Sequence, residues 1–191
     1  MALAFLNNRA NRKTFSGKAA VWVSTDLGAT WTKLTESSEL TITPETSESE
    51  AVNNRGHGRF DDVVKNYIIE GKFIERGEDV RQIFTDDTDQ SMRGKYYTLW
   101  IQGSELQTTG GAVVFEQWAF PYAKLKRNFQ GYALGSGDPM LSFSFYAEAN
   151  DSCATVTITA PTGDPCYAGA DDDTLTVADG EFHATADVSA T

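Results

Sequence analysis

The chain has 191 residues, of which 40% are hydrophobic and 12% aromatic, a composition that allows one well-buried domain, alone or with an appendage. It excludes a globally disordered protein, because disordered chains have too little apolar surface to bury. The formal net charge of −11 disfavours non-specific binding to DNA or to anionic membranes. No apolar run is long enough to span a bilayer, and the first residues do not resemble a signal peptide, so we expect synthesis and use in the cytosol.

The charge is spread unevenly along the chain. Residues 1–33 carry five Lys and Arg against one Asp, a balance of +4. Residues 148–191 carry nine Asp and Glu and neither Lys nor Arg, a balance of −9. A basic segment and an acidic segment at opposite ends favour head-to-tail contact between copies of the chain.

The first third of the chain is predicted to contain an arm, three short strands and a loop. Residues 1–18 have no sustained period and are interpreted as an N-terminal arm whose apolar residues could dock on a neighbouring subunit. Residues 19–24 and 31–36 are predicted as strands joined by a glycine-containing turn, and Glu39–Thr43 as a third strand. Pro44–Asp62 has almost no apolar content and is predicted as a long loop, which in a compact domain is usually functional or disordered.

The stretch Val63–Phe84 changes its hydrophobic period part-way along. Apolar residues of one parity predict a strand over Val63–Glu75 with one buried face. After Gly77 the apolar residues are spaced three and four apart and follow two acidic residues, which predicts a short helix over Glu78–Thr85. A helix packed on a sheet is therefore expected here.

The rest of the chain is predicted to add strands. Lys95–Ile101, Gly111–Tyr122 and Met140–Glu148 are predicted as strands, and the last shows the clearest alternation of apolar and polar residues. From Asn150 onward, short threonine-rich strands are separated by turns. The sequence therefore predicts a mainly β fold of sandwich- or barrel-like sheets with one short α-helix. Its β domain is expected over residues 19–149, followed by a small acidic β extension over 150–191.

The stretch Ser24–Trp31 reads S-T-D-L-G-A-T-W and is similar to the Asp-box of sialidases and other β-propellers. In such a turn the Asp carboxylate accepts turn amides, the glycine takes a positive φ and the Trp packs beneath the hairpin. The motif occurs once, in a chain too short for a six-bladed propeller. We interpret it as a structural turn and expect no glycosidase activity.

The other candidate sites favour no particular chemistry. The acidic runs Asp86–Asp89 and Asp171–Asp173 lack the ligand spacing of a calcium loop, and the two His and two Cys are too scattered for a zinc site. His57 has no nucleophile motif to act with, and the four tryptophans lack the basic groove of a nucleic-acid surface. Cys153 and Cys166 are expected to be free thiols, with a disulfide between them as the alternative. We therefore expect no catalytic residue, cofactor or metal.

In their order along the chain, these stretches resemble the phage major tail tube proteins, whose fold is shared with the tube protein of type VI secretion. The resemblance covers residues 15–149, from the hairpin Ala19–Glu36 through the strand and helix of Val63–Thr85 to the later strands. Two details add to it: G-K-F-I-E-R-G-E-D-V at the strand–helix junction, and F-P-Y-A-K-L before a glycine-rich turn and L-S-F-S-F. The acidic C-terminal segment has no counterpart in the minimal subunit.

The resemblance implies a structural virion protein whose subunits form rings, hexameric in the family, that stack into a hollow conduit for DNA. It implies that the loop after the early strands and the N-terminal arm both reach the next ring. The residues so implied at the inter-ring contact are Glu45, Glu48, Glu50, Asn53, Arg55, His57, Arg59, Arg9 and Arg12. Polar residues of the long strand are interpreted as facing a water-filled lumen: Lys65, Asn66, Glu70 and Lys72. An acidic lumen would repel DNA and let it slide.

The implied partners are other copies of the chain and other tail proteins such as a tape measure and a terminator, with DNA passing through without specific binding and no membrane. The implied location is the tail of a virion assembled in the host cytoplasm. We expect the sheets to be completed by other copies rather than closed within one chain.

Three alternatives stay open. A head-decoration, neck or tail-terminator protein would form a single ring that never stacks. A carbohydrate-binding or hydrolase module is suggested by the Asp-box. A small secreted β-domain would be held together by a Cys153–Cys166 disulfide.

Overall fold

The computed structural model describes residues 13–52, 58–74, 96–107, 113–125, 140–164, 167–170 and 173–189 of the chain. Over these residues the protein is mainly β, which confirms the predicted fold class. The helix predicted over Glu78–Thr85 lies outside the described residues. Among the residues described, no helix has the length and apolar character needed to cross a membrane.

The described residues form strands at most of the predicted positions. The residues predicted as separate strands at 31–36 and 39–43 belong to one continuous strand. The strands are β1 (Lys13–Ser24), β2 (Thr32–Val52), β3 (Gly58–Ile74), β4 (Tyr97–Gln107), β5 (Val113–Leu125), β6 (Met140–Glu148), β7 (Val156–Thr159), β8 (Thr174–Val177) and β9 (Ala184–Ser189).

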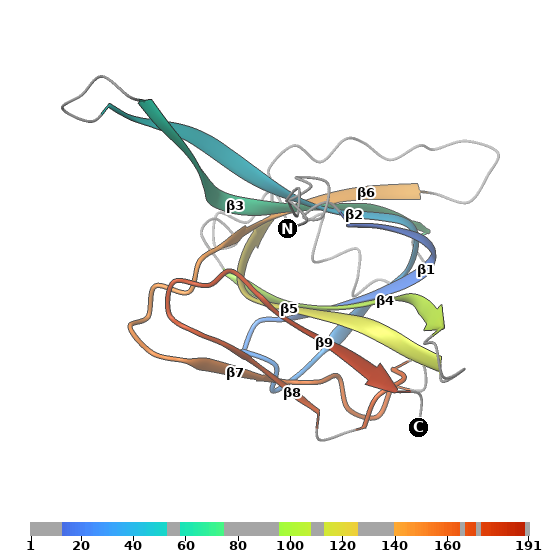
Figure 1. Cartoon of the computed structure of the whole chain (residues 1–191). Coiled ribbons are helices and arrows are strands. Elements are labelled where there is room, and N and C mark those ends of the chain that lie inside the picture. The colour runs from blue at the N-terminus through green and yellow to red at the C-terminus, as the bar shows by residue number, and fades with distance from the viewer. Residues whose placement is uncertain are drawn as a thin grey trace, which may run out of the picture.

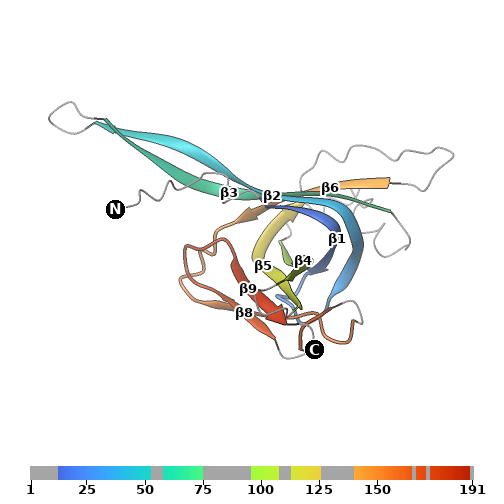
Figure 2. The same cartoon turned by 45° about the vertical axis from the view of Figure 1, so that its right-hand side comes forward.

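Six of these strands close into a barrel (Figures 1 and 2). Each strand is antiparallel to its neighbours in the order β4-β1-β2-β3-β6-β5, and pairing of β4 with β5 closes the ring. The barrel sheet is thus completed within one chain, contrary to the expectation that other copies complete it. Closure leaves the ring of six strands without a free sheet edge that a second copy could extend.

The inside of the barrel is filled by apolar side chains. Inward and outward residues alternate along each strand, so that on β3 the Ile69 side chain is fully buried while its neighbour Glu70 is exposed. The inward side chains with no exposed surface include Val21, Leu34, Leu40, Ile42, Leu99, Ile101, Phe120 and Phe145. A hollow conduit therefore cannot run through a single barrel.

The segment Pro44–Asp62, predicted as a loop, is instead the outer part of a β-hairpin. β2 and β3 stay in antiparallel register from the Glu45–Asn66 pair out to the Val52–Gly58 pair, with one irregularity between Glu45 and Thr46. Pairing with β1 and with β6 stops before this point, so residues 43–52 and 58–66, named here the ribbon, extend away from the barrel (Figures 1 and 2). The loop prediction was wrong because it relied on apolar alternation. Two strands can be polar on both faces and still pair through their main chains.

The N-terminal boundary of the sheet also differs from the prediction. β1 begins at Lys13, paired with Ile42, so residues 13–18 of the predicted N-terminal arm belong to the sheet. The pattern was missed because the register shifts between Ser16 and Ala19, and such a shift interrupts the alternation of the two faces. Residues 1–12 lie outside the described residues.

The C-terminal residues form a second layer on the outer side of β1, β4 and β5. β7 and β8 pair with each other, and their Ile158, Leu175 and Val177 pack against the outward-facing Trp22 and Trp100. β9 pairs with β5, and so it joins the sheet that forms the barrel. The predicted extension over 150–191 therefore shares a core and a sheet with the β domain.

Candidate functional site

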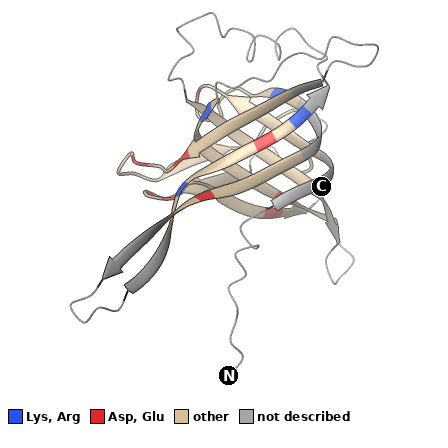
Figure 3. Cartoon of the chain, turned by 90° about the horizontal axis from the view of Figure 1, so that it is seen from above, with Lys and Arg blue, Asp and Glu red and all other residues tan. Residues whose placement is uncertain are grey.

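Two surfaces carry the residues that the sequence associates with assembly: the ribbon and the outer side of β2, β3 and β6, named here the polar face. The register places Thr41, Glu70 and Ser144 side by side across the three strands of this face. It lies on the opposite side of the barrel from the C-terminal layer, because β1, β4 and β5 complete the ring. Figure 3 shows acidic and basic positions interspersed along the barrel strands.

All four residues predicted to face a lumen lie on β3, on the outside of the barrel. Glu70 and Lys72 are exposed on the polar face, and Glu70 accepts a hydrogen bond from Ser144 Oγ at 3.2 Å. Lys65 is exposed where the ribbon begins. Asn66 is half-buried, and its Oδ1 is buried with no hydrogen-bond partner among the described residues. The structure thus brings Lys65, Glu70 and Lys72 to the surface, and a lumen beside them is a proposal.

The residues predicted at an inter-ring contact are only partly described. Glu45 is exposed at the base of the ribbon, while Glu48 and Glu50 on β2 and Arg59 on β3 lie further out along it. In the pairing of β2 with β3, Arg59 lies opposite Ala51, and Glu50 lies opposite Phe60 in the neighbouring pair. Asn53, Arg55, His57, Arg9 and Arg12 lie outside the described residues.

Sequence reasoning missed a charged and aromatic cluster between β5 and β6. The Tyr96 hydroxyl donates a hydrogen bond to Glu148 at 2.8 Å, and Lys124 Nζ donates to the other oxygen at 2.9 Å. The Lys124 ammonium also lies 4.4 Å from the centre of the Tyr96 ring. Burial raises the pKa of Glu148, but the hydrogen bonds from Lys124 and Tyr96 outweigh it and hold the pKa below its ordinary value. No local motif predicts this cluster, because strand register brings its members together.

The Asp-box forms the turn between β1 and β2. Asp26 accepts hydrogen bonds from Ser24 Oγ at 2.6 Å, from the Thr30 amide at 2.9 Å and from Thr30 Oγ1 at 2.6 Å. These hydrogen bonds, of which the one from Ser24 has the largest effect, lower the pKa of Asp26 to about 2. Gly28 takes a φ of +93°, which favours glycine. The motif is thus a structural turn, as predicted.

Trp31, the last residue of the motif, ties this turn to the C-terminal layer. Its indole N–H donates to the Thr159 carbonyl at 3.1 Å, and its ring meets that of Trp100 edge-on at 6.3 Å. A Cβ at Gly28 would lie 3.0 Å from the Trp31 ring, so the ring covers the turn closely. The motif therefore has a structural role, in the local turn and in the packing between the barrel and the C-terminal layer.

Of the acidic and cysteine residues considered as sites, the structure describes only Asp173 and Cys153. Asp173 accepts hydrogen bonds from the Tyr167 hydroxyl and from the Ala170 amide, each at 2.9 Å. Burial, followed by the bond to Asp173, raises the pKa of Tyr167 above its ordinary value. Within the described ranges, no group of three or more His, Cys, Asp and Glu could hold a metal ion. Cys153 carries a free, exposed thiol, and Cys166 is outside the described residues.

No protein-family model matches the sequence, and no curated protein matches it. Among solved structures, the chain is similar to a chain of the anti-feeding prophage (AFP) baseplate, a 6-fold symmetrised cryo-EM structure. That alignment has 13% identity and a TM-score of 0.38, over 70% of this chain and 91% of that one.

The chain is also similar to a mutant form of the Hcp1 protein from the E. coli EAEC 042 pathovar, with 11% identity and a TM-score of 0.37 over 84% of this chain and 97% of that one. A crystal structure of an Hcp protein gives 12% identity and a TM-score of 0.37 over 85% and 99%. At these identities and TM-scores, the similarities assign no function to this chain.

Proposed function

We propose that this chain is a structural, non-enzymatic tail tube subunit, which associates with copies of itself into rings that stack into a hollow conduit for DNA. The ribbon is the observation that carries the proposal. Among the described strands, residues 43–52 and 58–66 pair only with each other. A two-stranded ribbon is at best marginally stable in water, so its extension from the barrel calls for a surface that binds it.

The ribbon offers a route to stacking of one copy on the next. Neither outer edge of the ribbon is paired with another of the described strands, and an unpaired strand edge favours strand addition. Pairing of two ribbons with each other would give a closed dimer, so the proposal requires the ribbon of one copy to bind a different surface on the next copy. Such a heterologous contact propagates into a ring or an open filament.

The conduit of such an assembly would lie between copies, since apolar side chains fill each barrel. The polar face offers a hydrated lining in which Glu70 and Lys72 are exposed. Glu70 and Lys72 carry opposite charges and the chain as a whole carries −11, so such a lining would offer the DNA phosphates no net positive charge to bind and would let the DNA slide. A tape measure and a terminator would then be partners, and the virion tail the location.

Replacing Ser47–Val63 by an Asn-Gly turn tests the proposal. The new turn closes the hairpin on the Thr46–Val64 pair and suits a type I′ hairpin, so the barrel should still fold. We expect the full chain to form rings and hollow tubes in negative-stain electron microscopy, and the shortened chain to stay a folded monomer by circular dichroism and sedimentation.

A pair of charge reversals provides a matched control. Glu45→Lys alters the exposed base of the ribbon, whereas Asp151→Lys alters an exposed position in the C-terminal segment. We expect Glu45→Lys to shorten or abolish the tubes and Asp151→Lys to leave them intact. A full chain that stays monomeric under all assembly conditions, or a shortened chain that still forms tubes, contradicts the proposal. Single rings that never lengthen would point to a decoration, neck or terminator protein instead.

A further inference from the structure

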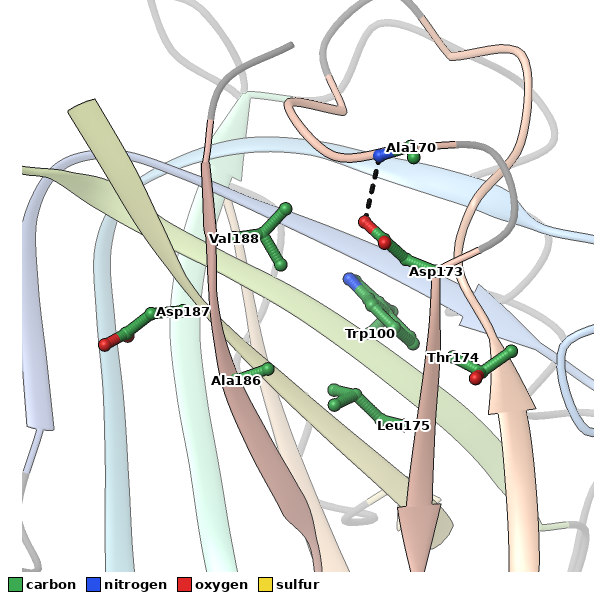
Figure 4. A pocket seen from close by; sticks show the side chains of 8 residues that line it. All are labelled: Trp100, Ala170, Asp173, Thr174, Leu175, Ala186, Asp187 and Val188. Carbon is green, nitrogen blue, oxygen red and sulfur yellow. Dashed lines mark hydrogen bonds between the residues drawn. The ribbon is translucent and has the colours of Figure 1, made fainter. Parts of the chain in front are cut away.

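A groove lies on the outer side of the barrel between β8 and β9 (Figure 4). It has a volume of about 370 Å³. Trp100 of β4 forms its floor, Leu175 of β8 lines one side, and Ala186 and Val188 of β9 line the other. Asp173 lies at one end. Thr174 and Asp187 complete the lining with Ala170, so the groove is mainly apolar, with acidic residues at its margin.

β8, which borders this groove, has one edge without a partner among the described strands. β8 pairs with β7 alone, and β9 pairs with β5 alone. The free edge of β8 presents main-chain N–H and C=O groups toward the groove. An extended segment can satisfy such groups by adding a strand, while its alternate side chains fill the apolar floor.

We propose that residues 1–12 of one copy bind in this groove of a second copy, as a third strand beside β7 and β8. The segment reads M-A-L-A-F-L-N-N-R-A-N-R, in which Leu3 and Phe5 alternate with Ala2 and Ala4. In an extended conformation the two large side chains share one face, where they suit the apolar floor, and the two alanines share the other.

Charge complementarity supports this occupant. Residues 1–12 carry Arg9 and Arg12 and no acidic residue. The groove is built largely by residues of the 148–191 segment, which carries nine acidic residues and neither Lys nor Arg. A basic segment that enters it gains a favourable interaction at modest salt concentration, which weakens as added salt screens the charges.

The reach of the chain favours a segment from a second copy. β1 starts at Lys13, and nine residues later Trp22 pairs with Trp100 at the groove floor, a path of roughly 30 Å along the strand. The eight residues from Phe5 to Lys13 span at most about 29 Å. To place Phe5 in its own groove, the segment would have to turn back at Lys13 and run along the length of β1, whereas a segment from a second copy meets no such limit.

This inference deepens the proposed self-assembly by naming one contact between copies, and it rests on that proposal only for the identity of the occupant.

The test of this inference uses the full chain with p-benzoylphenylalanine at position 5. Unlabelled protein and protein labelled with ¹⁵N are mixed and irradiated, and the crosslinked peptides are identified by mass spectrometry. We expect crosslinks between labelled and unlabelled chains, from position 5 to residues 173–177 or 186–188.

Two substitutions on β9 form a matched pair. Val188→Arg places a cation inside the groove, while Thr185→Arg adds the same charge at an exposed position that does not line it. We expect Val188→Arg to abolish the crosslink and Thr185→Arg to preserve it. Because Val188→Arg could disturb β9, Leu3→Asp is the second variant; it leaves the groove unchanged and should also abolish the crosslink.

The outcomes separate this inference from the proposed function. Crosslinks that map elsewhere, that form only within one chain, or that survive both Val188→Arg and Leu3→Asp overturn the inference, even where tubes form. Crosslinks in the groove between chains, in a sample that holds dimers and no rings, support the inference and contradict the tail tube proposal.

Discussion

The indole Nε1 of Trp22, on the first barrel strand, donates a hydrogen bond to Asp164 Oδ2 at 2.8 Å, across 142 positions of the sequence. Lys33 Nζ lies 3.9 Å from the other Asp164 oxygen and 5.7 Å from the centre of the Trp22 ring. The Trp22 side chain is 1% exposed, so Asp164 satisfies a donor that water hardly reaches. The barrel and the C-terminal layer should therefore unfold together.

Removing this contact should destabilise the whole chain. Asp164→Ala leaves the buried indole N–H without its acceptor, and we expect a loss of about 1.5–3 kcal/mol in the free energy of unfolding. Trp22→Phe removes the donor as well, so a double-mutant cycle should give a coupling energy of about 1 kcal/mol or more. Urea unfolding, followed by fluorescence and by circular dichroism, measures both quantities. Additive single losses, or a separate transition for the C-terminal layer, would contradict the prediction.

Asn150 should be the most sensitive polar residue at the junction between β6 and the C-terminal layer. Its buried amide donates to the carbonyls of Ala154 at 2.7 Å, Ala178 at 3.1 Å and Val177 at 3.2 Å, and its Oδ1 accepts the Ser152 hydroxyl at 2.7 Å. We expect Asn150→Ala to cost about 2–3 kcal/mol, because these carbonyls lose their donor.

The isosteric variant Asn150→Asp distinguishes hydrogen bonding from packing. A carboxylate would face the same carbonyls without a proton to donate, so it should be more damaging than alanine at neutral pH and partly recover in acid. Ser152→Ala, which removes only the hydroxyl partner, should cost less than Asn150→Ala. Urea midpoints measured at both pH values test this ranking, and equal losses for all three variants would refute it.

Gly71 on β3 is predicted to resist substitution because of a cross-strand ring. It pairs with Phe143 of β6, and a Cβ at this position would lie 2.5 Å from Phe143 Cζ. Phe143 is 4% exposed and has little room to move, so Gly71→Ala should cost about 1–3 kcal/mol through overpacking. Adding Phe143→Leu should recover part of this loss in thermal unfolding. If the unfolding temperature of Gly71→Ala equals or exceeds that of the unmodified chain, the Phe143 ring does not limit the size of the side chain at position 71.

The parts of the fold that the sequence predicts are those in which neighbouring residues carry the signal. The turn Ser24–Trp31 is predictable because its carboxylate, hydroxyls and glycine all lie within eight consecutive positions. The alternation that ends in Phe143 and Phe145 likewise marks β6 as a strand with one buried face. In both places the local chemistry is sufficient to determine the structure.

What the sequence does not predict depends on long-range pairing. Closure of the barrel requires β4 to pair with β5, and no local pattern distinguishes a closed sheet from an open one. The sequence of Pro44–Asp62 shows no apolar alternation, so nothing in it marks the two strands of the ribbon. The outward-facing Trp22 and Trp100 belong to a core only because the C-terminal layer covers them. These features need the register between strands, which residue types alone do not determine.

His183 should make the stability of the chain depend on pH. Its ring stacks on Trp118 at 4.7 Å and meets Tyr67 edge-on at 4.8 Å, and its Nδ1 is buried with no hydrogen-bond partner among the described residues. Burial lowers the pKa of His183 below its ordinary value of 6.5, with Glu181 opposing the shift. The unfolded chain therefore takes up the proton first as the pH falls. The contribution of neutral His183 to stability is full above the unfolded pKa of 6.5 and decreases as the pH falls through that value.

We expect the free energy of unfolding to decrease between about pH 7.5 and pH 5, and His183→Phe to remove part of that decrease, because the Phe ring keeps the stacking but cannot titrate. Urea unfolding of both proteins across this range isolates the histidine, since their carboxylates titrate alike. An NMR titration of the His183 ring provides the second measurement and should give a pKa below that of an exposed histidine. A His183 that titrates at or above its ordinary value, or a pH dependence that His183→Phe leaves unchanged, would show that burial does not control this group.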